Sequence, residues 1–181
     1  VFLDRIIEPR YSRARNLLRQ HAGDAQAYVA LNRYYADFMI DYMDLPPERV
    51  HVIPHGLQLD GHAEVPPGRI TKSPEDPVVI GYFARMCEDK GFHLLVDAFI
   101  QMCQDADLPP LLLRAAGYCS KGDRLFLAEQ VKKLQAAGLA DRFEYLGEPD
   151  RAGKIEIIQS FDVMSVPTVY PESKGLSVLE A

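Results

Sequence analysis

Two cationic side chains follow a short apolar stretch in the middle of the chain. The stretch PVVIGYF, residues 77–83, is rich in β-branched and aromatic residues, which is typical of a buried strand. Arg85 and Lys90 come after it in the segment ARMCEDKG. Two cations at the carboxyl end of a strand can hold an anion, and an arginine can do so through two hydrogen bonds. The alternative is that both are surface charges paired with Glu88 and Asp89.

The segment YPESKGLSVLEA at the end of the chain holds a second group of residues suited to binding, with Glu172 and Glu180 on either side of Gly175. A helix is predicted to begin near Gly175, where the free backbone N–H groups of Gly175 and Leu176 would attract an anion. The two carboxylates could accept hydrogen bonds from hydroxyl groups on both sides of that anion. A nucleotide sugar has this layout, with a phosphate group between two hydroxylated parts. The alternative is that Glu172 caps the helix and Glu180 is a solvated helix residue.

The elements that must position these residues alternate along the second half of the chain. Strands are predicted at 77–83, 111–117, 143–147 and 162–167, and helices at 91–103, 123–137, 154–161 and from 175 onward. This alternation predicts an α/β fold with right-handed βαβ units and a Rossmann-like parallel sheet flanked by helices. Such sheets bind ligands beyond the carboxyl ends of their strands, where both groups of residues lie.

The first half of the chain contains fewer elements. Strands are predicted at 27–31 and 49–56 and a helix at 33–42, which is too little for an independent doubly wound domain. The stretch DGHAEVPPGRITKSPEDP is rich in proline and glycine and indicates a linker. We therefore expect residues 1–59 to be the tail of an N-terminal domain, 60–76 a linker, and 77–181 a second, truncated domain.

Composition narrows the class of protein. The chain has 181 residues, of which 48% are hydrophobic and 25% charged, and this balance is typical of a globular protein. The net charge of −6 argues against a nucleic-acid partner. The three cysteines show no paired spacing, which favours reduced thiols in the cytoplasm. The only D-x-D segment, Asp105–Asp107, follows a predicted helix, and we interpret it as a helix end and not as a metal site.

Four segments together resemble the retaining glycosyltransferases of GT-B fold, family 4. PESKGLSVLEA resembles the E-x7-E motif of that family, and GYFARMCEDKGFHLLVDAF is similar to its G-x-x-x-R-x-x-x-x-K-G segment. RVHVIPHGLQLD resembles the strand and turn before the interdomain linker, and LGEPD resembles the loop that approaches the nucleotide base. The segments occur in the family's order over residues 27–181.

The resemblance implies transfer of a sugar from a nucleotide-sugar donor with retention of anomeric configuration, and neither cofactor nor metal. Arg85 and Lys90 would neutralise the diphosphate, and Glu172 would face the transferred sugar. The resemblance further implies donor-binding roles for Glu180 at the ribose, for Ser173, Lys174, Gly175 and Leu176 at the sugar and phosphate, and for Gly117 and Gly147 at the nucleotide. The family commonly has E-G-F-G where this chain has Glu172-Ser173-Lys174-Gly175, so that Lys174 adds a cation near the donor sugar.

Two rival functions stay open at this point. One is another enzyme of the same fold that uses a nucleotide sugar, such as an epimerase, and the other is a non-catalytic nucleotide-binding module. The resemblance also implies an N-terminal domain that would hold a glycan, lipid or small-molecule acceptor, with peripheral membrane contact open for that domain. We expect a cytoplasmic protein, and we expect this chain alone to bind a donor without transferring its sugar.

Overall fold

The computed structural model describes residues 10–62, 73, 75–172 and 174–181. The chain forms two compact units, of which unit 1 comprises Val1–Leu57 and Pro171–Gly175. Unit 2 comprises Gln58–Tyr170 and Leu176–Ala181. Most of the predicted linker, 60–76, lies outside the described residues, as does Ser173.

Unit 1 contains a two-stranded parallel sheet. Its elements are α1 (Arg10–His21), β1 (Tyr28–Ala30), α2 (Arg33–Met43), the 3-10 turn η2 (Pro47–Arg49) and β2 (Val50–Val52), and β1 pairs with β2. Asn32 caps α2 by accepting a hydrogen bond from the backbone N–H of Tyr35. The Arg15 and Arg19 side chains of α1 both donate to the backbone carbonyl oxygen of Tyr42 at the end of α2. The two helices are therefore joined by polar contacts.

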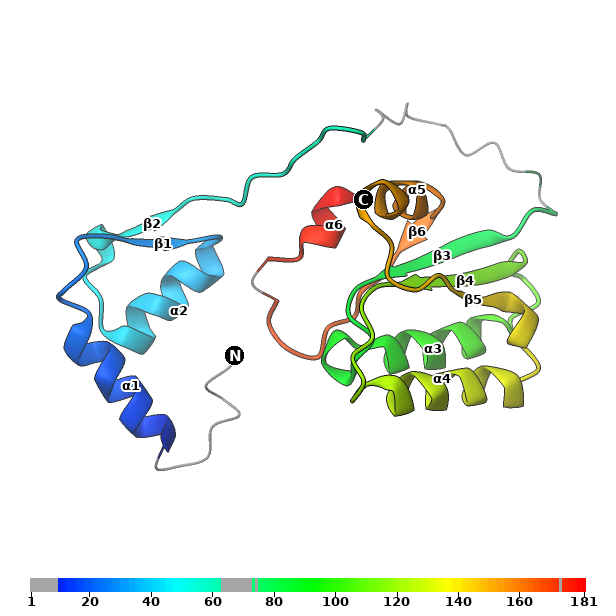
Figure 1. The fold of residues 1–181 in the computed structure, drawn as a ribbon, viewed down its shortest axis with the longest axis horizontal. Helices are drawn as coiled ribbons and strands as arrows, with labels where there is room; N and C mark the ends of the chain where they lie inside the picture. Colours follow the sequence, from blue (N-terminus) through cyan, green and yellow to red (C-terminus); the bar gives the residue numbers. More distant parts are fainter. Residues whose placement is uncertain (1–9, 63–72, 74, 173) are drawn as a thin grey trace. The chain divides into compact units, whose positions relative to one another are not determined.

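Unit 2 is built on a four-stranded parallel sheet in the order β5-β4-β3-β6 (Figure 1). The strands are β3 (Val78–Phe83), β4 (Leu111–Ala116), β5 (Phe143–Tyr145) and β6 (Val163–Met164). The two central strands, β3 and β4, are the most apolar and supply much of the core, as a parallel sheet covered on both faces requires.

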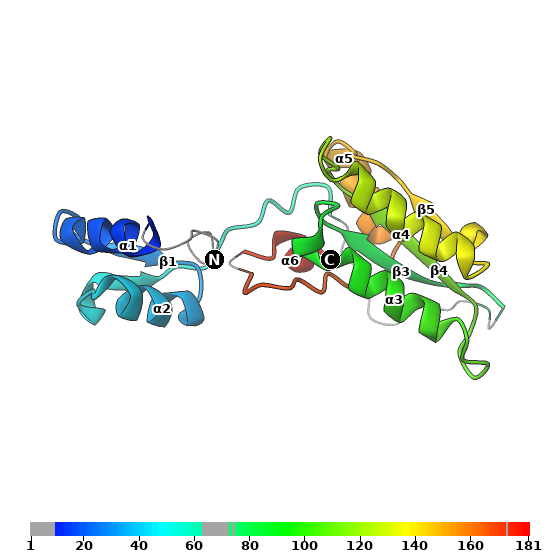
Figure 2. The ribbon, with the colours of Figure 1, turned by 90° about the horizontal axis from the view of Figure 1, so that it is seen from below.

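Helices cover both faces of this sheet. The helices of unit 2 are α3 (Phe92–Met102), α4 (Arg124–Ala136), α5 (Arg151–Gln159) and α6 (Leu176–Glu180), with 3-10 turns η3 (Glu88–Lys90) and η4 (Ala140–Arg142). Figures 1 and 2 show α3 and α4 together on one face and α5 on the other. Phe92, Leu95, Val96 and Phe99 form the buried side of α3.

The predicted α/β fold and parallel sheet are confirmed, with small shifts at the element ends. Helix α5 begins at Arg151, three residues before the predicted start, because the Asp150 carboxylate caps it by accepting from the Gly153 N–H at 2.9 Å. Helix α6 begins at Leu176, directly after Gly175. Of the described residues, no helix has the length and apolar character needed to cross a membrane.

Candidate functional site

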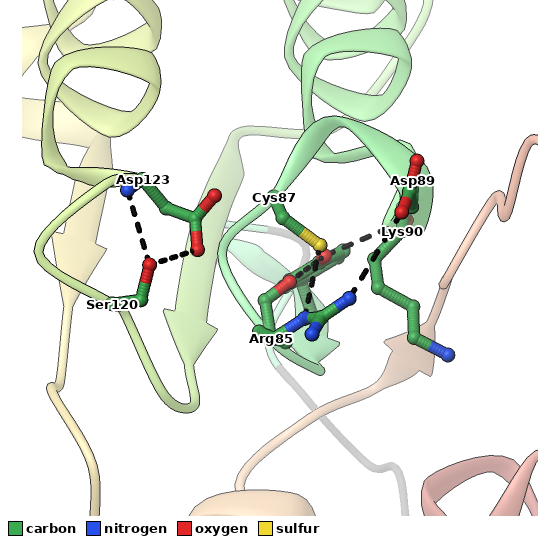
Figure 3. Close-up of polar contacts among 7 residues, drawn as sticks. Arg85, Cys87, Asp89, Lys90, Ser120 and Asp123 are labelled. Atoms are coloured by element: carbon green, nitrogen blue, oxygen red, sulfur yellow. Dashed lines mark hydrogen bonds and ion pairs between the residues drawn. The ribbon is translucent and has the colours of Figure 1, made fainter. Parts of the chain in front are cut away.

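Arg85 lies in the loop that leaves the carboxyl end of β3. We call residues 84–90 the cationic loop. The Arg85 Nε–H donates to Cys87 Sγ at 3.3 Å, and Arg85 Nη2 lies 4.0 Å from Asp89 Oδ2 (Figure 3). Arg85 therefore has the acidic neighbour that the surface-charge alternative expects, but half of its side chain (51%) stays exposed and can meet a ligand.

The electrostatic surroundings keep Arg85 protonated. The hydrogen bond with Cys87 is the main cause that raises the pKa of Arg85 above its usual value, and Asp123 and Asp89 act in the same direction. Asp123 belongs to the loop after β4, which faces the cationic loop in Figure 3. The Ser120 hydroxyl donates to Asp123 Oδ2 at 2.5 Å and accepts from the Asp123 backbone N–H at 3.2 Å. The carboxylate near Arg85 is thus held in place.

Lys90 ends the 3-10 turn η3 and does not itself belong to the following helix. Its Nζ lies 5.0 Å from the centre of the Tyr170 ring, a cation–π contact, and Figure 3 shows the side chain extended away from Arg85. The Val169 N–H donates to the Asp89 carbonyl oxygen at 3.0 Å. The loop after β6 is therefore joined to the cationic loop by both backbone and side chain.

Gly117 and Gly147 lie next to each other beyond the ends of β4 and β5. The Gly117 N–H donates to the Gly147 carbonyl oxygen at 2.8 Å, and the Tyr145 hydroxyl donates to the Gly117 carbonyl oxygen at 2.9 Å. Gly117 has φ of +131°, and a Cβ there would overlap the Ala84 carbonyl oxygen. Only glycine lets the loops after β3 and β4 approach each other this closely.

Glu180 is not the solvated residue of the alternative interpretation. Its Oε1 lies 2.6 Å from Lys154 Nζ, and the two side chains are only 14% and 22% exposed. Lys154 lies on α5 and Glu180 on α6, so the ion pair joins two helices of unit 2. The second carboxylate oxygen leaves Glu180 able to accept further hydrogen bonds.

Glu172, Lys174 and Gly175 belong to the segment that packs with unit 1. The Tyr35 hydroxyl donates to the Pro171 carbonyl oxygen at 2.6 Å. The Glu172 Oε1 accepts from the Lys174 N–H at 3.4 Å, a long bond within the loop. Gly175 has a left-handed φ of +57° and turns the chain into α6.

The structure thus brings four predicted residues, Arg85, Lys90, Gly117 and Gly147, to one edge of the sheet in unit 2, with Leu176 and Glu180 in the same unit. Sequence reasoning did not find Tyr82, Lys154 or Tyr170. Their contacts join elements far apart in the chain, and no local spacing signals them.

The D-x-D segment forms a local turn. The Asp107 N–H donates to Asp105 Oδ1 at 3.0 Å just beyond the end of α3. Within the part of the chain that the structure describes, no group of three or more His, Cys, Asp or Glu side chains is placed to hold a metal ion.

Comparison of the sequence with known proteins gives a family match and several relatives. Residues 69–181, more than half of the chain, match the family described as glycosyl transferases group 1. A phosphatidyl-myo-inositol mannosyltransferase of Mycobacterium leprae is 29% identical over 130 residues, which are 71% of this chain and 32% of that protein. The Mycobacterium tuberculosis protein of the same name is 32% identical over 130 residues, which are 71% of this chain and 31% of that protein. The chain spans about a third of the length of these relatives.

Solved structures show the same fold. The Anabaena protein HepE in complex with UDP superposes with a TM-score of 0.74 at 24% identity, over 97% of this chain and 46% of that one. A sucrose-phosphate synthase from Thermosynechococcus elongatus superposes with a TM-score of 0.73 at 20% identity. The match covers 93% of this chain and 41% of that one. The fold is that of the GT-B glycosyltransferases. This chain belongs to the glycosyl transferases group 1 family.

Proposed function

We propose that this chain supplies the donor-binding part of a retaining glycosyltransferase of family 4, which transfers a sugar from a nucleotide-sugar donor to an acceptor. The observation that carries the proposal is that Arg85 and Lys90 lie on one loop, beside the contact between Gly117 and Gly147. The cations suit a diphosphate, and the glycine backbone suits a flat nucleoside placed close to it.

The cations would act on the leaving group. When the sugar–phosphate bond breaks, negative charge grows on the departing diphosphate, and cations already in place stabilise it without reorganisation. The backbone N–H groups of Gly175 and Leu176, where α6 begins, would also donate to the donor phosphate. Residues 173–176 would contact the sugar and phosphate, and the carboxylate of Glu172 would face the transferred sugar.

Glu180 would bind the ribose of the donor. The Lys154 ammonium, 2.6 Å from Glu180 Oε1, fixes the orientation of the carboxylate. The remaining lone pairs can then accept hydrogen bonds from the two ribose hydroxyl groups. A carboxylate fixed in this way binds a diol without the loss of its own rotamer freedom.

The donor and acceptor are proposed from the names of the relatives. HepE was solved with UDP, and the mycobacterial relatives are named as mannosyltransferases that act on phosphatidyl-myo-inositol. UDP-glucose and GDP-mannose are therefore the first donors to test, and a lipid-linked polyol is the first acceptor. We expect the reaction to take place in the cytoplasm without a cofactor, and the 181-residue chain to bind the donor without transferring the sugar.

Calorimetric titration of the 181-residue chain tests the proposal. It compares the affinity for UDP, GDP and ADP with the affinity for the corresponding nucleosides. One diphosphate should bind at least tenfold more tightly than its nucleoside. A transfer assay on the longest natural form of the protein, with the anomeric configuration read by NMR, then separates a retaining transferase from an epimerase or a binding module. Equal affinity of every nucleoside and its diphosphate would contradict the proposal.

A further inference from the structure

The Tyr82 side chain connects the core of unit 2 to the cationic loop. Tyr82 is fully buried on β3, and its hydroxyl lies 2.9 Å from the Arg85 carbonyl oxygen and 3.5 Å from the Lys90 carbonyl oxygen. Its single O–H proton therefore points at the backbone of the two residues that carry the proposed diphosphate-binding cations. The shorter contact, to Arg85, is the stronger hydrogen bond.

The position of this hydroxyl is fixed by packing. The Tyr82 ring packs against Phe92 of α3 with ring centres 4.9 Å apart, inside the main hydrophobic cluster. A side chain surrounded on all sides has few alternative rotamers. The Tyr82 hydroxyl is therefore held at a fixed position relative to the core.

The hydroxyl also stays a donor under all ordinary conditions. Burial is the main cause that raises the pKa of Tyr82 far above its usual value, so the phenol keeps its proton. A buried hydroxyl without an acceptor is costly, which favours loop conformations that keep the Arg85 carbonyl oxygen near it.

The cationic loop makes further backbone hydrogen bonds, and the Arg85 carbonyl oxygen also accepts from the Cys87 N–H at 2.9 Å. The Met86 N–H donates to the Tyr118 carbonyl oxygen at 2.8 Å, and the Asp89 carbonyl accepts from Val169. These bonds hold the loop to the loops after β4 and β6. The Tyr82 hydroxyl instead links the backbone of both Arg85 and Lys90 to strand β3 itself.

We propose that Tyr82 is a positioning residue for the diphosphate, which acts through the backbone of Arg85 and Lys90 and touches no ligand itself. The inference rests on the proposed function, because it assumes that these cations bind the diphosphate. It predicts that the Tyr82 hydroxyl strengthens the binding of the diphosphate group and leaves the binding of the nucleoside unchanged.

The test compares Tyr82→Phe with Tyr145→Phe by calorimetry with UDP and uridine, and with GDP and guanosine. Both changes remove one hydroxyl that donates to a loop carbonyl at 2.9 Å, but Tyr145 contacts Gly117, in a loop without the two cations. Tyr82→Phe should lower the ratio of nucleoside Kd to diphosphate Kd about two- to tenfold. Tyr145→Phe should leave that ratio within twofold of the unchanged chain.

An equal loss of nucleoside and diphosphate affinity in Tyr82→Phe would show a merely structural role and overturn the inference. The double variant Arg85→Ala/Tyr82→Phe adds a second criterion, because a hydroxyl that acts through Arg85 should cost less once that side chain is gone. Full additivity would also overturn the inference. If Arg85→Ala itself leaves the ratio of nucleoside Kd to diphosphate Kd unchanged, the proposed function is wrong. If Arg85→Ala lowers that ratio and Tyr82→Phe does not, only the inference about Tyr82 is wrong.

Discussion

Lys154 and Glu180 lie on different helices, α5 and α6, and meet in an ion pair of 2.6 Å whose side chains are only 22% and 14% exposed. Such a shielded pair differs from the ordinary surface pair. Water screens it less, and the loss of one partner leaves the other charge in a poorly solvated place. Lys154 therefore fixes the orientation of the Glu180 carboxylate.

Lys154→Met should lower the free energy of unfolding by about 1–3 kcal/mol, because Glu180 would stay shielded without a cation. The matched control is Lys133→Met, which breaks the pair of Lys133 with Asp97, at 2.8 Å but with side chains 44% and 48% exposed. That control should cost less than about 1 kcal/mol. Urea unfolding of both variants measures the difference. Equal losses of unfolding free energy would contradict a larger contribution from the shielded Lys154–Glu180 pair.

Gly91→Ala should be strongly destabilising. Gly91 has φ of +72°, and a Cβ at this position would overlap the Pro167 carbonyl oxygen, so that the loop after β6 would have to move. Gly138 has nearly the same φ of +73° with nothing within 4 Å of its Cβ position. Gly138→Ala should cost only about 1–2 kcal/mol from backbone strain, and Gly91→Ala distinctly more. Thermal unfolding of both variants tests this, and a similar fall in Tm would mean that the close contact with Pro167 is unimportant.

Glu172→Gln should lower kcat about a hundredfold to a thousandfold in a form of the enzyme that transfers sugar. Glutamine keeps the shape but loses the charge that would offset positive charge on the sugar carbon in the transition state. Stability should change little, because the side-chain carbonyl oxygen of glutamine can still accept from the Lys174 N–H. Glu129→Gln, at an exposed position on α4, is the control. A less stable enzyme with unchanged kcat would mean that Glu172 only orders its loop.

The sequence predicted the fold of unit 2 well because its elements have strong local signals. The apolar β-rich run before Phe83 and the helical spacing of Phe92, Leu95 and Phe99 each follow from short-range physical preferences. The start of α5 was missed because the capping effect of Asp150 outweighs the polar character of its first turn.

The candidate site was predictable only in part. The residues that would touch a ligand lie in loops after strands, so that strand order alone brings Arg85 and Gly117 to one edge. The residues that support them were not predictable, since Tyr82 is one apolar strand position among several and Lys154 one charge on a helix. Their roles depend on side-chain contacts with distant segments.

The most direct test of the central claim is the effect of Arg85→Ala on the binding of a nucleoside diphosphate and of its nucleoside. A charge-assisted contact to phosphate is worth roughly 1.5–3 kcal/mol, and its loss should weaken diphosphate binding about tenfold to a hundredfold. Lys132→Ala, which removes an exposed cation of α4, serves as the control for general charge effects. We expect diphosphate affinity to fall in Arg85→Ala alone, with nucleoside affinity unchanged. Equal losses for the diphosphate and the nucleoside, or no loss for either, would contradict the assignment of this edge of the sheet as the donor diphosphate site.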